Sequence, residues 1–177
     1  MRIIKYHPLI FILLAITLVT VSHAQPKCKI EHYSNEDGLS HDIITCIFKD
    51  SEGFMWFGSW DGIIRFDGHK FLSFKSSPGD FSQIKNDRID QIIEDKSNHL
   101  WLKAYDGQVY RFDKSSDQFM PLSAIIGLNE KTKITFDKIV ACFDNMLWLS
   151  TMNNGLICVN DTRLNASTFI AYKKGNV

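Results

Sequence analysis

A tryptophan followed by a hairpin-turn dipeptide occurs three times in this chain, and the spacing is nearly constant. The three pairs are Trp56 with Asp61-Gly62, Trp101 with Asp106-Gly107, and Trp148 with Asn154-Gly155. Successive tryptophans are 45 and 47 residues apart. A period of about 40 to 50 residues is typical of propellers, in which each unit is one four-stranded blade. The spacing therefore predicts an array of β-propeller blades.

The first two copies align well beyond the tryptophans, at a constant shift of 45 residues. The matching positions are Asp42, Ile44, Ile47, Asp50, Trp56, Asp61 and Gly62 against Asp87, Ile89, Ile92, Asp95, Trp101, Asp106 and Gly107. The third copy is looser: Leu147-Trp148-Leu149 repeats Leu100-Trp101-Leu102, and Cys142 aligns with the turn aspartates.

Hydrophobic alternation and turn residues divide each copy into four short strands. The predicted strands are 42–49, 54–59, 63–67 and 70–74, then 88–94, 100–104, 109–113 and 118–122, then 138–143, 147–152, 156–160 and 168–172. Four antiparallel strands make one blade, so we expect an all-β chain with blades at about 40–75, 86–122 and 134–172. We also expect a type I′ turn at Asp61-Gly62, an isolated strand from Lys29 to Tyr33, and no helix outside the leader.

The first 24 residues have the pattern of a secretory signal peptide. Arg2 and Lys5 precede an uncharged run of 13 residues, 9–21, which is short for a bilayer span, and Ser22 and Ala24 supply the small residues of a cleavage site. We predict cleavage after Ala24 and a mature domain, 25–177, in the periplasm or outside the cell, with no membrane span. An uncleaved membrane anchor is the alternative.

Charge and motifs exclude several classes of function. The chain has 20 Lys plus Arg and 20 Asp plus Glu, well interspersed, whereas nucleic-acid binders show a basic stripe. The histidines outside the leader, at 32, 41, 69 and 99, lack the spacing of metal ligands. No nucleophile elbow or phosphate-binding glycine loop occurs. We therefore predict no nucleic-acid partner, no catalytic residue, no metal and no cofactor.

Four cysteines, Cys28, Cys46, Cys142 and Cys158, would enter an oxidising compartment, where disulfides are allowed. Cys142 and Cys158 lie on the first and third predicted strands of one blade, roughly 9 to 10 Å apart, which is beyond the reach of a disulfide. We expect buried free thiols, with a disulfide as the alternative.

Trp60 lies outside the repeated core pattern, directly beside the first turn dipeptide. The equivalent positions in the other copies are assigned to Tyr105 and Asn153. Hairpin tips that gather on one face of a ring would offer stacking planes and hydrogen-bond acceptors to a polyhydroxylated ligand. The predicted ligand-binding residues are Trp60, Asp61, Tyr105, Asp106, Asn153 and Asn154. The alternative is that these are ordinary exposed turn residues.

The first copy resembles a known repeat family. The segments that carry the resemblance are Asn35-Glu36-Asp37-Gly38-Leu39-Ser40, Asp50-Ser51-Glu52-Gly53-Phe54-Met55-Trp56-Phe57-Gly58-Ser59 and Gly62-Ile63-Ile64-Arg65-Phe66-Asp67-Gly68. They are similar to the two-component regulator propeller repeat. The resemblance extends over about 30–161 and weakens later, where Asn98 replaces a glycine and Lys103-Ala104 replaces Gly-Thr.

The resemblance implies a periplasmic sensor region of a hybrid two-component histidine kinase of the Bacteroidetes type. In that family a propeller region precedes an immunoglobulin-like domain, a membrane helix and a kinase, and the cue is a glycan. Three blades leave two apolar faces uncovered, so we expect further blades or other copies of the chain as partners. The predicted function is a non-enzymatic N-terminal sensor portion that responds to carbohydrate. The alternative is a secreted propeller that binds proteins or glycans without signalling.

Overall fold

The computed structural model describes residues 29–75, 84, 86–127, 134–143, 146–160 and 170–172. The predicted leader lies outside these residues. The chain divides into two units, Met1–His32 and Tyr33–Val177, and every strand and short helix among the described residues belongs to the second. The strand expected from Lys29 to Tyr33 does not form. Tyr33 instead packs its ring against Phe66 and Phe71, with centroids 5.3 and 5.4 Å away.

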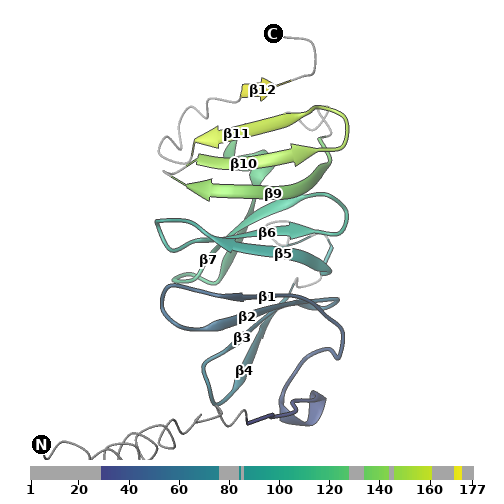
Figure 1. The fold of residues 1–177 in the computed structure, drawn as a ribbon, viewed down its shortest axis with the longest axis vertical. Coiled ribbons are helices and arrows are strands. Elements are labelled where there is room, and N and C mark those ends of the chain that lie inside the picture. Colours follow the sequence, from purple (N-terminus) through teal and green to yellow (C-terminus); the bar gives the residue numbers. More distant parts are fainter. Residues whose placement is uncertain are drawn as a thin grey trace, which may run out of the picture. The chain divides into compact units, whose positions relative to one another are not determined.

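Three four-stranded antiparallel sheets follow one another along the second unit (Figure 1). The first contains β1 (Ile44–Lys49), β2 (Met55–Ser59), β3 (Gly62–Phe66) and β4 (Phe71–Phe74). The second contains β5 (Ile89–Glu94), β6 (Leu100–Ala104), β7 (Val109–Asp113) and β8 (Gln118–Pro121). The third contains β9 (Phe136–Phe143), β10 (Met146–Thr151), β11 (Leu156–Asn160) and β12 (Ile170–Tyr172). In each sheet neighbouring strands are consecutive in sequence, which confirms the predicted blade architecture.

Two single-turn helices interrupt the β structure, so the expectation of no helix was wrong at these points. The 3₁₀ turn η1 (Asn35–Asp37) is closed by Ser34, whose hydroxyl accepts from the Glu36 N–H and whose own N–H donates to the Asp37 carboxylate at 2.7 Å. The helix α2 (Leu122–Ile125) follows β8 and buries Leu122. No helix in the described residues is long and apolar enough to span a membrane.

The hairpin turns are not of type I′. That turn needs a positive φ at both central residues, and Asn98 and Asp117 are the only described non-glycine residues with positive φ. Ser59 pairs with Gly62, which puts Trp60 and Asp61 at the centre of the turn and leaves the positive φ of 92° to Gly62 alone. A right-handed turn followed by a left-handed glycine is the other common way to close a short hairpin.

Strand pairing also corrects the alignment of the third copy. Cys142 pairs with Leu147, the residue before Trp148, just as Lys49 pairs with Met55 and Glu94 with Leu100. Cys142 therefore occupies the position that precedes the turn aspartates. The error arose because four residues separate Cys142 from its partner Leu147, whereas five separate Lys49 from Met55 and Glu94 from Leu100. A constant shift cannot show this difference.

Two apolar cores lie between the three sheets. Trp56 is fully buried in the first core with Phe112 of the second sheet, and their ring centroids are 5.6 Å apart. Trp101 is equally buried in the second core with Leu149 of the third sheet. Trp148, on the third sheet, is only half-buried. Each of the first two repeated tryptophans thus packs against the next sheet, and no fourth sheet occurs among the described residues to cover Trp148.

Candidate functional site

The hairpin tips of successive sheets are tied to the segments that enter the following sheet. At the first tip the Gly62 N–H donates to the Asp87 carbonyl at 2.8 Å. The next residue, Arg88, accepts through its carbonyl from the Tyr105 N–H at 2.9 Å, so the second tip lies on the same segment. Two neighbouring tips are therefore joined through the two residues that precede β5.

The second and third tips are joined in the same way. The Phe136 N–H donates to the Gly107 carbonyl at 2.8 Å, and the Met152 N–H donates to the Thr135 carbonyl at 3.1 Å. Met152, which is 65% exposed, is thus the counterpart of Tyr105. This corrects the assignment of that position to Asn153, because the third tip has one more residue before its turn glycine. All three tips lie at the same end of their sheets, as the rim hypothesis requires.

Arg88 lies against both aromatic residues predicted for the ligand site. Its guanidinium carbon is 4.1 Å from the centroid of the Tyr105 ring and 5.2 Å from that of the Trp60 ring. The Trp60 ring is also 6.2 Å from the ring of His41. Trp60 and Tyr105 remain 49% and 60% exposed. The structure therefore brings Trp60 and Tyr105 to one place, with a cation on their faces.

Arg88 is held by an ion pair as well as by the rings. Its Nε donates to Asp90 Oδ1 at 3.0 Å, and Lys103 Nζ is 3.3 Å from Asp90 Oδ2. Its backbone N–H donates to Asn86 Oδ1 at 3.0 Å. The Arg88 side chain still has 35% of its surface exposed. The sequence pattern does not reveal Arg88, because this residue belongs to no motif and the residue 45 positions before it is Ile43.

The other predicted site residues have local roles at the tips. Asp61 Oδ2 is 3.1 Å from Lys75 Nζ, and Asp106 Oδ1 accepts from the Gln108 N–H at 3.0 Å. The Asn154 N–H donates to Thr151 Oγ1 at 2.9 Å, and Asn153 is exposed. These bonds stay within single hairpins. The cluster that the structure assembles across two tips is Trp60, Arg88 and Tyr105.

A second polar cluster lies at the opposite end of β1 and joins the first two sheets. Lys114 Nζ is 2.8 Å from Glu94 Oε1 and 3.1 Å from Asp50 Oδ2. The exposed fractions of these three side chains are 8%, 10% and 0%. Glu94 also accepts from the Ser51 N–H at 2.7 Å. The repeat pattern does not predict this cluster, because Lys114 occupies the place of Gly68 in the first copy.

Ionisation in this cluster follows from opposing effects. Burial alone would raise the pKa of Asp50, but hydrogen bonds from Trp56 and Lys114 outweigh it and hold the pKa below its usual value. Burial would likewise lower the pKa of Lys114, but its bonds to Glu94 and Asp50 raise the pKa instead. Both groups are therefore charged at neutral pH, and the cluster is a structural link between two sheets.

The turn aspartates explain the spacing between aspartate and tryptophan in the repeat. Asp50 Oδ1 accepts from the Phe54 N–H at 2.9 Å, and its Oδ2 accepts from Trp56 Nε1 at 2.8 Å. Asp95 does the same in the second sheet, where its Oδ2 accepts from Trp101 Nε1 at 2.9 Å. One carboxylate thus closes the turn and satisfies the buried indole, which gives these residues a structural role.

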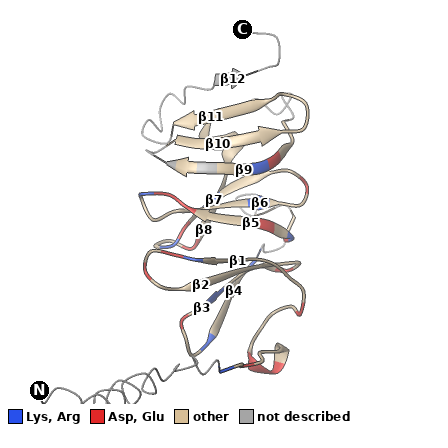
Figure 2. Cartoon of the chain, viewed as in Figure 1, with Lys and Arg blue, Asp and Glu red and all other residues tan. Residues whose placement is uncertain are grey.

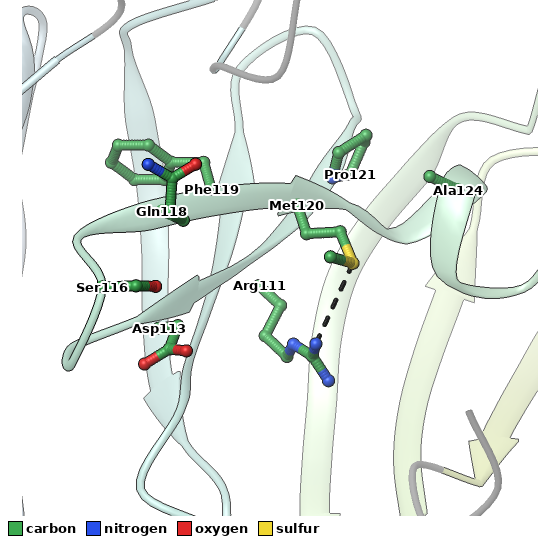
Figure 3. A pocket seen from close by; sticks show the side chains of 8 residues that line it. All are labelled: Arg111, Asp113, Ser116, Gln118, Phe119, Met120, Pro121 and Ala124. Carbon is green, nitrogen blue, oxygen red and sulfur yellow. Dashed lines mark hydrogen bonds between the residues drawn. The ribbon is translucent and has the colours of Figure 1, made fainter.

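A cavity of about 580 Å³ lies on the outer edge of the second sheet, between β7, β8 and α2 (Figure 3). Its lining residues are Arg111, Asp113, Ser116, Gln118, Phe119, Met120, Pro121 and Ala124. Figure 3 shows the Met120 side chain directed toward Arg111, and Arg111 Nη2 is 3.9 Å from Met120 Sδ. Neither the repeat pattern nor any motif indicates this cavity.

Cys46 and Cys158 carry free thiols, in agreement with the expectation for these two residues. Burial raises the pKa of both thiols, so neither is a reactive thiolate at neutral pH. Cys28 lies outside the described residues. No group of three or more His, Cys, Asp or Glu side chains that could hold a metal occurs within the part of the chain that the structure describes.

The family model described as Two component regulator propeller matches residues 38–61. This confirms the resemblance seen in the first copy. Among curated proteins, Histidine kinase P4 from Formosa agariphila is 40% identical over 48 residues, which cover 27% of this chain and 4% of the kinase.

Solved structures support the same relation. The extracellular domain of the hybrid two component system BT3049 from B. thetaiotaomicron matches 83% of this chain with a TM-score of 0.62 and 20% identity, which shows the fold. The corresponding domain of BT4673 matches 76% with a TM-score of 0.53 and 30% identity. The chain spans 20% and 19% of these two solved chains, so it is similar to a small part of each.

Proposed function

Because residues 38–61 match the two-component regulator propeller repeat, we propose that the chain is part of the extracytoplasmic sensor of a two-component regulator. The similar solved domains are extracellular parts of hybrid two component systems, and the curated relative is a histidine kinase. Under this proposal residues 1–24 direct export. The propeller binds the cue outside the cytoplasm, and a kinase elsewhere in the protein transmits the signal.

The proposed cue is a carbohydrate that binds at the hairpin tips. The observation that supports this is the exposed pair of aromatic rings, Trp60 and Tyr105, both in contact with Arg88. Aromatic faces pack against the C–H faces of sugars, and nearby carboxylates and amides accept hydroxyl hydrogen bonds. Figure 2 shows Lys, Arg, Asp and Glu mixed along the first two sheets and their loops, whereas β10 and β11 of the third sheet carry no charged residue.

Oligosaccharide binding to the chain tests the site. Titration by calorimetry against a panel of neutral and acidic oligosaccharides should find at least one ligand, and Trp60→Ala and Tyr105→Ala should each weaken its binding about tenfold or more. Met120→Ala is the matched control, because Met120 is 44% exposed on β8, away from the tips. Equal losses in all three variants, or no ligand in the panel, would contradict a carbohydrate site at the tips.

The proposed partners are further blades, or other copies of the chain, packed on the sheet faces. The half-buried Trp148 supports this, since its counterparts Trp56 and Trp101 are fully buried against a following sheet. Reading the gene beyond codon 177 tests the sensor proposal. An open frame through more blades and a kinase is the expected result, and a stop codon followed by no such regions would contradict it.

A further inference from the structure

We infer that the ligand of the tip site carries an oxyanion, a carboxylate or a sulfate on a sugar, and that Arg88 binds it. This inference rests on the proposed function, which places a carbohydrate at Trp60 and Tyr105. The proposed function requires only stacking and hydroxyl contacts, which any saccharide could make. The surroundings of Arg88 narrow the ligand to an acidic saccharide.

The first reason is that Arg88 has hydrogen-bonding capacity to spare. A guanidinium carries five N–H donors. The Nε donor is used by Asp90 at 3.0 Å, and no hydrogen bond joins either terminal nitrogen to any residue that the structure describes. With 35% of the side chain exposed, these donors are accessible to a ligand. Two parallel N–H groups match the two oxygens of a carboxylate or sulfate.

The second reason is the local charge. Asp90 is shared between Arg88 and Lys103, at 3.0 and 3.3 Å, so these three residues together carry a net positive charge. The neighbouring Asp61 is itself paired with Lys75 at 3.1 Å. A cation that shares its carboxylate partner with a second cation favours an anion over a neutral hydroxyl.

The third reason is that the guanidinium is already in position. Its backbone is fixed by the bonds from Tyr105 and to Asn86, and its side chain by Asp90 and the two rings. The Arg88 guanidinium is thus ordered before a ligand binds, which reduces the entropy lost on association. The guanidinium also occupies one face of each ring, so a sugar must approach from the open sides, where the terminal N–H groups are accessible.

The test compares two ligands that differ only in charge. Trigalacturonate and its methyl ester have the same rings and hydroxyl groups, and a sulfated galactose trisaccharide serves as the third probe. Each is titrated into the chain by calorimetry at low and high salt. We expect an acidic probe to bind about 10 to 100 times more tightly than the methyl ester. High salt should weaken the binding of the acidic probe and leave the binding of the ester unchanged.

Variants assign the effect to Arg88. In Arg88→Gln the affinity for the acidic probe should fall to that for the ester. Arg88→Lys keeps the charge but loses the planar guanidinium, so it should retain only part of the preference for the acidic probe over the ester. Lys49→Gln is the matched control, because Lys49 is an exposed cation at the far end of β1. Thermal unfolding and near-ultraviolet circular dichroism check that the variants remain folded.

Each outcome of these titrations either supports or overturns the role of Arg88. Preference for trigalacturonate or for the sulfated probe, lost in Arg88→Gln and kept in Lys49→Gln, supports the inference and identifies the oxyanion. Equal binding of acid and ester, abolished by Trp60→Ala, overturns the inference while the carbohydrate site stands. A preference that survives Arg88→Gln also overturns it. Failure of every probe and of the neutral panel contradicts the inference and the proposed carbohydrate function together.

Discussion

The interface between the first and second sheets differs in chemistry from that between the second and third, although the strands that form them repeat. The first contains aromatic rings packed edge to face and a buried ion cluster centred on Lys114. Beside Trp101 and Phe136, the second is lined mainly by aliphatic side chains, and the Gln91 amide bridges it. The repeat therefore specifies the backbone frame and the tryptophan, while the remaining interface residues vary from one interface to the next.

The shared element should have the largest effect on stability. Trp56→Ala and Trp101→Ala each remove a buried indole and leave a turn aspartate without its Nε1 donor. We expect each to lower the free energy of unfolding by about 3–5 kcal/mol, measured by urea denaturation. Trp148→Ala should cost clearly less, since Trp148 is half-buried. Equal losses at all three positions would show that the third tryptophan is as enclosed as the others.

The ion cluster should distinguish the first interface from the second. Lys114→Met leaves Asp50 and Glu94 buried without their cation, and removal of one partner from such a pair costs about 3–5 kcal/mol. The double variant Lys114→Met with Glu94→Gln should recover part of this loss, because one uncompensated charge is gone. Lys75→Met, which breaks an exposed pair, should cost no more than about 1 kcal/mol. If Lys114→Met lost no more free energy of unfolding than Lys75→Met, the Lys114 cluster would add nothing to the stability of the interface.

Sequence reasoning recovered the parts of the molecule that local patterns determine. The tryptophan period, the strand alternation and the turn glycines predicted three four-stranded sheets. Trp60 and Tyr105, predicted from their places at the hairpin tips, both contact Arg88, and their binding of a ligand stays a prediction. Arg88 itself and Lys114 were missed. Both act across an interface between sheets, and neither has a counterpart of its own kind in another copy, so no periodic signal marks them.

Errors of one residue arose where the third copy departs from the spacing of the other two. The shift of 47 residues between Trp101 and Trp148 placed Cys142 at the turn aspartate. Alignment on the turn dipeptide Asn154-Gly155 placed Asn153 at the position of Tyr105, whereas backbone pairing places Cys142 one position earlier and Met152 at the position of Tyr105. A side-chain pattern with a period of two residues cannot reveal a one-residue change in a loop, because the strands on both sides stay in phase with their own sheets.

Acid should weaken the first interface through Asp50. The pKa of Asp50 is lowered by folding, so its contribution to stability is complete above its unfolded value near 3.8 and is lost as the pH falls through the lower folded value. At neutral pH Asp50→Asn should cost about 1.5–3 kcal/mol, because charged hydrogen bonds to Trp56 and Lys114 are replaced. The difference between this variant and the parent chain should shrink below pH 3.8 in acid titrations of stability. A constant difference down to about pH 2 would exclude a lowered pKa for Asp50.

The smallest effect is expected at the second interface, where Gln91 bridges the inner strands. Its Nε2 donates to the Ile139 carbonyl at 2.6 Å, and its Oε1 accepts from the Ile139 N–H at 2.9 Å. At the first interface the Thr45 hydroxyl donates to the Ile89 carbonyl. Gln91→Ala should cost about 1–2 kcal/mol and should speed hydrogen exchange of the Ile139 amide, because that N–H loses its acceptor. Thr45→Val removes a bond to a carbonyl only, so it should leave exchange at Ile89 nearly unchanged. Faster exchange throughout both inner strands in Gln91→Ala would instead show that the bridge holds the two sheets together, and the second interface would then depend on a single polar side chain as much as the first depends on Lys114.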